Sequence, residues 1–339
     1  MSKIALAVHG GAGTILKSEM TAELESEYRS GLEYALLKGW EVLRKNGSAL
    51  DAVETTTVAL ENFPLFNAGR GAVFTHEGKN ELDAAIMDGA NGKAGAVAFV
   101  KNVVNPIKLA RLVMERTEHI LLGGGGANEF AREMKVEMAD DAYFYTEHRY
   151  RQLLQAREAG KVQLDHAGEV ESREWRVESK EIKVESDNQV TDSLDSPLST
   201  LHSKIGTVGA VACDFNGNLA AATSTGGMTN KKFGRIGDTP IIGAGTFADN
   251  RTCAVSCTGH GEFFMKTLAA FDVSARMKYK NLNLESAANE VIENLREIGG
   301  EGGLIAVDAF GNVALPFNSD GMYRGFMTAD GEMTVEIYR

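Results

Sequence analysis

The residues best suited to covalent chemistry in this sequence are Gly206 and Thr207, where a polar tract meets a run of small apolar residues. A threonine hydroxyl becomes a useful nucleophile when a neighbouring base removes its proton, and an α-amine with a pKa of about 8 can do this near neutral pH. If the chain were cut before Thr207, nucleophile and base would belong to one residue. Gly206 lacks a Cβ, which leaves its carbonyl open to attack. The alternative is that this dipeptide merely opens a β-strand.

Groups that could stabilise a developing negative charge follow strand-like runs in the second half of the chain. Hydroxyls lie beside glycines in residues 223–227 and 258–262, and residues 243–245 form another glycine-rich segment. Such segments combine side-chain donors with backbone N–H groups that a ligand can approach closely, as an oxyanion hole requires. Each of them alone is more simply explained as a β-turn.

Arg235 and Asp238 lie three residues apart in a glycine-rich loop and allow two explanations. They form an exposed ion pair of little energetic value, or they bind a zwitterion. In the second case the guanidinium holds an α-carboxylate through two hydrogen bonds, and the carboxylate holds an α-ammonium group. Asn67, in segment 64–69, either caps a turn or presents its amide to a substrate.

Composition excludes several classes of partner. The 339 residues carry a net charge of −12, and no basic stripe is present, so we expect neither nucleic acid nor an anionic membrane as a partner. The apolar run 4–8 is too short for a secretory signal, and no run approaches the roughly 20 apolar residues of a membrane span, so we expect a cytoplasmic protein. Cys213, Cys253 and Cys257 support neither a disulfide framework nor a zinc site.

The elements that position these residues can be predicted from periodicity. Residues 3–8 predict a strand that stops at a glycine turn over 9–13, and a helix follows whose apolar residues recur at steps of three and four up to Asn46-Gly47. Ser48 then opens a second helix as part of a capping box. Short strands are predicted at 71–75, 82–87 and 94–100, a helix after Asn105-Pro106, and a strand at 120–122.

The polar tract separates two parts of the pattern. Residues 165–206 contain ten Asp and Glu against five Lys and Arg, and we expect a mobile tether over about 160–206. Strands at 207–214 and 219–224 then flank a hairpin signal at 215–218. Further strands are predicted at 241–243, 254–258, 304–307 and 313–317, and helices at 262–278 and 284–298. Two sheets packed face to face, with helices outside, would cover every apolar face.

The chain resembles the plant-type L-asparaginase / isoaspartyl aminopeptidase family, which are N-terminal nucleophile hydrolases related to glycosylasparaginase. The resemblance rests on motifs in the same order at 7–13 (Ala-Val-His-Gly-Gly-Ala-Gly), 64–74, 81–89, 206–214 and 314–324, and it leaves out mainly the tether. It implies an α+β fold, the four-layer αββα sandwich of these hydrolases. It also implies self-cleavage into an α subunit, residues 1–206, and a β subunit, residues 207–339, which together form one structural domain.

The resemblance further implies roles for the matched catalytic residues. Thr207 falls on the nucleophile, which is exposed when its hydroxyl attacks the carbonyl of Gly206. Thr225 matches a threonine that hydrogen-bonds around the nucleophile. Thr258 and Gly259 match the hydroxyl and the backbone N–H that stabilise the oxyanion.

Substrate-binding residues are implied in the same way. Arg235 and Asp238 match the residues that hold the α-carboxylate and the α-amine of the substrate. Gly261 matches a carbonyl that helps to hold the amine, and Asn67 lies near the nucleophile. His260 either modulates specificity at the leaving group or has no role in it.

No cofactor for chemistry is implied, but a structural Na⁺ is. The segment 60–70 resembles the sodium-binding loop of the family, in which main-chain carbonyls surround the ion. Oxygen-only ligation suits such a hard cation. The matching positions are Leu60, Glu61, Phe63, Phe66, Ala68 and Arg70.

From the resemblance we expect hydrolysis of β-aspartyl peptides and L-asparagine through a β-aspartyl-threonine acyl-enzyme that releases L-aspartate. The expected partners are a small-molecule or dipeptide substrate and the protein's own cleaved subunit, in a dimer of αβ heterodimers. Two alternatives are a glycosylasparaginase-like amidohydrolase and an uncleaved aspartate-binding protein. Activity on a glycosylated asparagine, or binding without turnover, would distinguish them.

Overall fold

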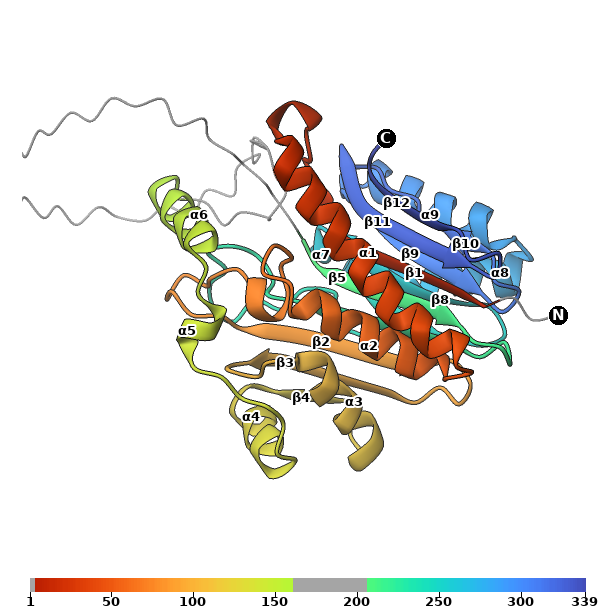
Figure 1. Ribbon diagram of the computed structural model, residues 1–339, viewed down its shortest axis with the longest axis horizontal. Coiled ribbons are helices and arrows are strands. Elements are labelled where there is room, and N and C mark those ends of the chain that lie inside the picture. The colour runs from red at the N-terminus through yellow and green to blue at the C-terminus, as the bar shows by residue number, and fades with distance from the viewer. Residues whose placement is uncertain (1–3, 161–205) are drawn as a thin grey trace, which may run out of the picture.

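The computed structural model describes residues 4–160 and 206–339, and these residues form two β-sheets with helices packed on them (Figure 1). The larger sheet has the strand order β12-β11-β1-β5-β6-β2-β3-β4, and the smaller one has the order β10-β9-β8-β7. Neighbouring strands are antiparallel except β3 and β4. The larger sheet contains β1 (Ala5–Gly13), β2 (Leu82–Asp88), β3 (Ala94–Val100), β4 (Leu121–Gly123), β5 (Val208–Cys213), β6 (Leu219–Thr225), β11 (Gly321–Thr328) and β12 (Met333–Tyr338). The smaller sheet contains β7 (Thr246–Ala248), β8 (Cys253–Gly259), β9 (Gly302–Asp308) and β10 (Val313–Ala314).

Helices α1 (Ala22–Arg44), α2 (Ala49–Glu61) and α3 (Pro106–Arg116) cover one face of the larger sheet. Apolar residues of α1 recur at steps of three and four, so one side of the helix is buried against the strands. The side chain of Ser48 accepts the backbone N–H of Asp51 at 3.1 Å, which caps the start of α2. The first helical layer therefore follows directly from sequence signals.

The other face of the larger sheet packs on the smaller sheet. Buried apolar side chains fill this interface, including Ala5 and Ala7 of β1, Val211 of β5, and Ile305 and Val307 of β9. Alternate residues of β8 and β9 point the opposite way and pack on α8 (Ala269–Lys280) and α9 (Leu284–Glu297). The short helix α7 (Gly261–Thr267) precedes α8.

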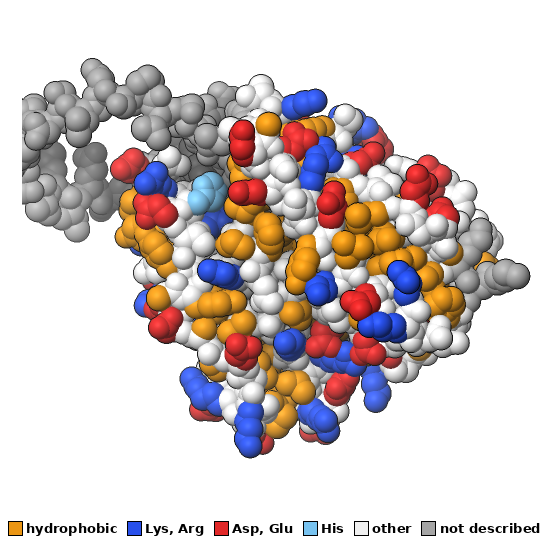
Figure 2. Space-filling view, viewed as in Figure 1, with side chains coloured by type: hydrophobic (Ala, Val, Ile, Leu, Met, Phe, Trp, Pro, Cys, Tyr) orange, Lys and Arg blue, Asp and Glu red, His pale blue; other side chains and the backbone are white. Residues whose placement is uncertain are grey.

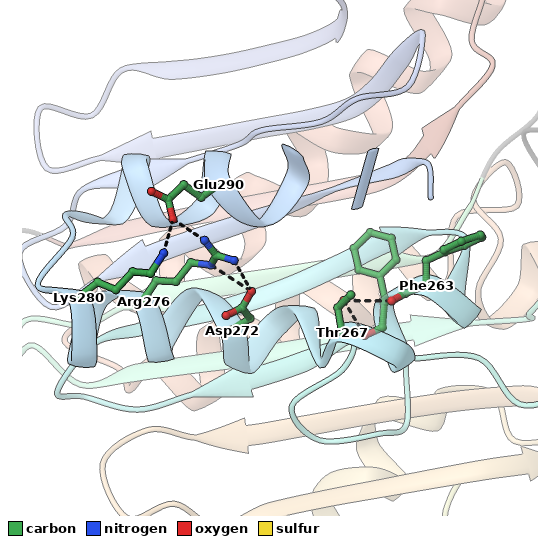
Figure 3. A network of polar contacts seen from close by, with 7 residues as sticks. Phe263, Thr267, Asp272, Arg276, Lys280 and Glu290 are labelled. Atoms are coloured by element: carbon green, nitrogen blue, oxygen red, sulfur yellow. Dashed lines mark hydrogen bonds and ion pairs between the residues drawn. The ribbon is translucent and has the colours of Figure 1, made fainter. Parts of the chain in front are cut away.

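Helices α8 and α9 are joined by ion pairs on their outer side (Figure 3). Arg276 of α8 bonds Asp272 one turn earlier at 2.9 Å, and it also bonds Glu290 of α9. Lys280 reaches the same Glu290 carboxylate at 3.1 Å. These groups are partly exposed, so their contribution is small, and they mainly fix the register of the two helices.

The remaining helical segments lie beside β3 and β4 or at loops. They are α4 (Gly124–Glu133), α5 (Asp141–Phe144), α6 (Glu147–Glu158) and the 3₁₀ turns η1 (Lys17–Glu19) and η2 (Gly69–Gly71). Among the described helices, none is long and apolar enough to cross a membrane. On the face drawn in Figure 2, side chains of both charges are interspersed with hydrophobic ones.

The mixed α and β class predicted from the sequence is confirmed, and most predicted elements are present. Several predictions were wrong. Residues 9–13 continue β1 through a bulge between His9 and Gly11, whereas residues 72–75 and 241–243 form no strand. The helix predicted at 262–278 is broken at Leu268, which has a positive φ of 50°. The strands β7, β11 and β12 were not predicted. The tether predicted over 160–206 lies almost entirely outside the described residues.

Candidate active site

Thr207 lies immediately before β5, in the middle of the larger sheet. Its hydroxyl donates to Thr225 Oγ1 over 3.1 Å, and Thr225 Oγ1 also accepts the backbone N–H of Gly227 at 3.0 Å. Thr225 ends β6, the antiparallel neighbour of β5, so sheet pairing places the two hydroxyls together. Thr207 is half-buried, which leaves its hydroxyl accessible from one side.

Gly206 is buried, and the backbone of β1 packs closely against it. A Cβ on Gly11 would come within 2.3 Å of the Gly206 nitrogen, and Gly11 has a φ of +120°. Only glycine combines this positive φ with so close an approach of two backbones. The bulge in β1 therefore leaves room for the backbone of Gly206 directly beside Gly11.

A single pocket brings most of the predicted residues together. Thr207 and Thr225 lie on one side, and Arg235 and Asp238 come from the loop after β6. Gly259, at the end of β8, completes the set. The lining residues are Gly206, Thr207, Thr225, Gly227, Met228, Arg235, Gly237, Asp238, Thr239 and Gly259.

Arg235 is held by a residue that the sequence analysis did not single out. Its Nε and Nη2 donate to the two oxygens of Glu262, both at 2.8 Å, in a bidentate ion pair. Burial alone would raise the pKa of Glu262, but the hydrogen bonds and charge of Arg235 lower it overall. Because one edge of the guanidinium is fixed in this way, its remaining N–H groups have a defined direction. The sequence signal that could have identified Glu262 is an acidic residue directly after Gly261.

Asp238 is buried, and its Oδ2 has no hydrogen-bond partner among the described residues. Burial raises the pKa of this carboxyl to about 7, and the charge of Arg235 offsets part of the effect. Gly245 and Gly261 clear the space around it, since a Cβ on either would lie 2.8 or 2.7 Å from a carboxylate oxygen. An unpartnered carboxylate beside an arginine is a suitable place for a cationic group.

Thr258 and Gly259 lie at the end of β8, facing the bulge of β1. Thr258 Oγ1 accepts the backbone N–H of Ala12 at 3.3 Å, so its own proton can still be donated. Gly259 has a φ of +141°, and a Cβ there would lie 2.4 Å from the carbonyl oxygen of Glu301. A side chain is therefore excluded at the position where the pocket needs an open N–H.

Asn67 supports the pocket from behind. Its amide donates to the carbonyl of Gly227 at 2.8 Å, and its side-chain oxygen accepts the N–H of Val73 at 3.0 Å. These bonds fix the turn that follows Thr225. His260 does not line the pocket, and its ring packs against Phe263 with centroids 5.8 Å apart. Burial lowers the pKa of His260.

The loop predicted to bind sodium presents main-chain oxygens. Glycines leave these carbonyls uncovered, because a Cβ on Gly69 would lie 2.5 Å from the Glu61 oxygen and one on Gly71 would lie 2.1 Å from the Phe66 oxygen. The buried guanidinium of Arg149 bonds the carbonyls of Leu65 in this loop, at 3.1 Å, and of Gly71 directly after it, at 2.9 Å, and neither of these is a predicted sodium ligand. Main-chain carbonyl oxygens, which this loop offers, are the kind of ligand that a hard cation prefers.

The side chain of Glu61 is also buried next to this loop. Its Oε1 accepts the hydroxyl of Ser224 at 2.7 Å and the N–H of Ile107 at 3.0 Å. Burial raises the pKa of Glu61 to about 8, and the hydrogen bonds oppose this. Within residues 4–160 and 206–339, no group of three His, Cys, Asp or Glu side chains is arranged to hold a metal ion.

A threonine hydroxyl, a second hydroxyl beside it and a pair of charges for a zwitterion define a site for acyl transfer on an amino-acid substrate. Comparison with known proteins agrees with this class. The model of the asparaginase family matches residues 2–337, so the chain belongs to this family, as the resemblance indicated.

Individual relatives match over almost their whole length. A putative isoaspartyl peptidase/L-asparaginase of Dictyostelium discoideum is 52% identical, with 97% of this chain and 94% of the relative aligned. The isoaspartyl peptidase of Salmonella typhimurium is 48% identical over 100% of both chains. A plant-type L-asparaginase of Pyrococcus abyssi is 43% identical over 96% of both.

Proposed function

We propose that this protein is a self-activating N-terminal threonine hydrolase that cleaves β-aspartyl peptides and L-asparagine to release L-aspartate. The observation that carries the proposal is the pocket that Thr207, bonded to Thr225 at 3.1 Å, shares with Arg235 and with Asp238, whose buried Oδ2 has no partner among the described residues. The names of the relatives support the same substrate class.

Activation begins in the uncut chain. The Thr207 hydroxyl attacks the Gly206 carbonyl, and the C–N bond between the two residues breaks as the nitrogen takes up a proton. The product is an ester between Gly206 and the Thr207 side chain. Water hydrolyses this ester to a Gly206 carboxylate and a free Thr207 hydroxyl. The new α-amine is the base that the hydroxyl lacked before the cut.

Turnover repeats the same chemistry on a substrate. Arg235 and Asp238 hold the α-carboxylate and α-ammonium of the aspartyl group, which places its side-chain carbonyl against Thr207 Oγ1. The α-amine of Thr207 takes the proton of the Thr207 hydroxyl. The hydroxyl of Thr258 and the backbone N–H of Gly259 stabilise the oxyanion that forms at the substrate carbonyl. The protonated amine or ammonia leaves, and water then releases L-aspartate from the acyl-enzyme.

The architecture and assembly belong to the same proposal. Two sheets that share one apolar interface, each with helices on its outer face, support assignment to the four-layer αββα sandwich. We assign residues 1–206 and 207–339 as the subunits after cleavage, in a cytoplasmic dimer of αβ heterodimers. Na⁺ in the loop would be held by carbonyls of Leu60, Glu61, Phe63, Phe66, Ala68 and Arg70. It would supply no chemistry beyond fixing that loop.

Intact mass and N-terminal sequencing of the purified protein test the proposal. The 36.5 kDa chain should give way to two fragments, the smaller beginning at Thr207. The cut protein should release aspartate from a β-aspartyl dipeptide. A chain that remains whole and binds aspartate without turnover would refute the proposal, as would a cut protein that accepts only glycosylated asparagine.

A further inference from the structure

The proposed mechanism leaves one fully buried titratable residue beside the nucleophile unused, and this residue is His9. We propose that His9 is a positioning residue, which, through a buried chain of hydroxyl groups, fixes the main chain of Thr207 relative to the substrate-binding loop. The inference rests on the proposed function, because it assigns His9 a part in that reaction.

The imidazole of His9 bridges the two sheets. Its Nδ1 lies 2.9 Å from the carbonyl oxygen of Thr207, and its Nε2 lies 2.8 Å from Ser256 Oγ in β8. The chain continues from Ser256 to Thr223 Oγ1 at 2.7 Å and from Thr223 to Thr246 Oγ1 at 2.6 Å. All four of these side chains, from His9 to Thr246, are completely buried.

The bond between His9 and the Thr207 carbonyl determines the donor and the acceptor in each hydrogen bond that follows. A carbonyl only accepts, so Nδ1 of His9 carries a proton and donates it to Thr207. If the ring is neutral, Nε2 must accept from Ser256, whose oxygen then accepts from Thr223, and Thr223 in turn accepts from Thr246. Burial lowers the pKa of His9 to about 3, with the bond to the Thr207 carbonyl opposing this, which agrees with a neutral ring.

The far end of the chain lies at the substrate-binding loop. Thr246 has a single hydroxyl proton, which it donates to Thr223 over 2.6 Å. Its Oγ1 also lies 3.2 Å from the carbonyl oxygen of Thr239, the residue after Asp238, so this contact is the weaker branch of a bifurcated hydrogen bond. Thr223 and Ser256 lie two residues before Thr225 and Thr258 on their strands, and therefore face the same side of each sheet as those residues. One buried network thus connects the nucleophile with the binding loop.

A glycine makes room for the bond between His9 and Ser256. A Cβ on Gly209 would lie 2.0 Å from Ser256 Oγ and 2.5 Å from His9 Nε2. Gly209 is only two residues after Thr207, within β5. Glycine at position 209 therefore leaves space for the hydrogen bond between His9 and Ser256.

The bond to Thr207 matters most after the chain is cut. Thr207 then loses its covalent link to Gly206 and becomes a chain end, and ends tend to be mobile unless they are tied down. Holding its carbonyl fixes the peptide plane from which the α-amine and the hydroxyl project. Loss of the bond between His9 and the Thr207 carbonyl should lower kcat. KM should change little, because Arg235 and Asp238, which bind the substrate, stay in place.

The test compares His9→Phe, which keeps a ring without nitrogens, with His9→Asn, whose amide can still donate from near the Nδ1 position. Ser256→Ala removes the next hydroxyl, and Ser274→Ala is the matched control. Ser274, in α8, shares a buried hydroxyl bond of 2.6 Å with Thr252, the residue before β8. The fraction cut is measured by mass, and kcat and KM are measured per cut enzyme on a β-aspartyl dipeptide.

We expect His9→Phe to lower kcat about 100-fold with KM changed less than about threefold, as for a displaced catalytic group. His9→Asn should recover at least about tenfold, and Ser256→Ala should fall between them. Ser274→Ala should match the wild type. Equal kcat in His9→Phe and Ser274→Ala, or an effect on KM alone, would overturn the inference.

A second readout does not depend on turnover. In protein labelled with ¹⁵N-histidine, one of the seven histidines should show a neutral ring protonated at Nδ1 that does not titrate between pH 5 and 8, and His9→Asn should remove that signal. A His9 signal that titrates near its ordinary pKa would overturn the inference, even if the variants fold poorly. A wild type that neither cuts itself nor hydrolyses the dipeptide overturns the proposed function, and the inference with it.

Discussion

The carboxyl of Asp238 should make the folded protein less stable at neutral pH, so that Asp238→Asn stabilises the fold while it removes activity. Asp238 is buried with one oxygen unpartnered, and its pKa is raised by burial to about 7. In the unfolded chain the Asp238 carboxyl has its ordinary pKa, so its ionisation there carries no free-energy cost of burial. Asparagine has nearly the same shape and no charge to bury.

The magnitude and its pH dependence follow from the two pKa values. The rise from 3.8 to about 7 corresponds to roughly 4 kcal/mol, since a tenfold change in proton affinity is worth about 1.4 kcal/mol. Because the folded-state pKa is the higher one, the penalty is nearly absent below pH 4, grows between pH 4 and 7, and is complete above pH 7. We expect Asp238→Asn to add about 2 to 4 kcal/mol to the free energy of unfolding at pH 8, and less than about 1 kcal/mol at pH 4.5.

The assay is urea unfolding at both pH values in a Thr207→Ala background, which keeps a single uncut chain. Asp214→Asn is the matched control. Asp214 is buried as well, but its carboxylate accepts the N–H groups of Asn216 and Asn218 at 2.8 and 3.0 Å, so asparagine there should destabilise at both pH values. If Asp238→Asn destabilises the fold at pH 8, or changes stability equally at both pH values, the reasoning from burial is wrong.

Further predictions concern activity and self-cleavage. In otherwise wild-type enzyme, Asp238→Asn should lower kcat/KM at least about 30-fold, because a buried ion-pair partner of the substrate is lost, and wild-type kcat/KM should fall as the pH drops below about 7. Thr207→Ala should remain one chain of 36.5 kDa without turnover, whereas Thr207→Ser should still cut itself, as followed by mass. Arg235→Lys should raise KM at least about tenfold, because lysine cannot form a bidentate pair, and steady-state kinetics would contradict this if KM were unchanged. Gly261→Ala should also raise KM but leave self-cleavage intact, since its Cβ would lie 2.7 Å from an oxygen of Asp238.

Local signals in the sequence predicted the elements that carry the site. The apolar spacing of α1, the cap at Ser48 and the hairpin after β5 depend only on neighbouring residues, and the structure contains all three. The residues of the pocket were found through long motifs in a fixed order. Thr207 precedes β5, Thr225 ends β6 and Gly259 ends β8, and the two sheets bring these strand ends together at one pocket.

What the sequence did not predict depends on contacts between distant residues. Glycines at 10, 11 and 13 suggested a turn, yet they lie inside β1. A side chain at Gly11 would meet the backbone of Gly206, and one at Gly10 would meet the ring of Phe66. The partner of Arg235 is 27 residues away, and that of His9 is 247 residues away. β7 is only three residues long, too short for an alternating pattern to be recognised.

The strand order of the larger sheet has a consequence for how the protein survives stress. β5 lies between β1 and β6, and β6 pairs with β2, so strands that precede residue 206 in the chain pair with strands that follow it. If the chain is cut there, as we propose, these strand pairings and the cores around them join the described parts of the two pieces. Refolding after denaturation is then a bimolecular reaction between the two pieces, and its rate falls on dilution. The lifetime of the cut enzyme therefore depends on how slowly it unfolds, because each molecule folds as one chain only once.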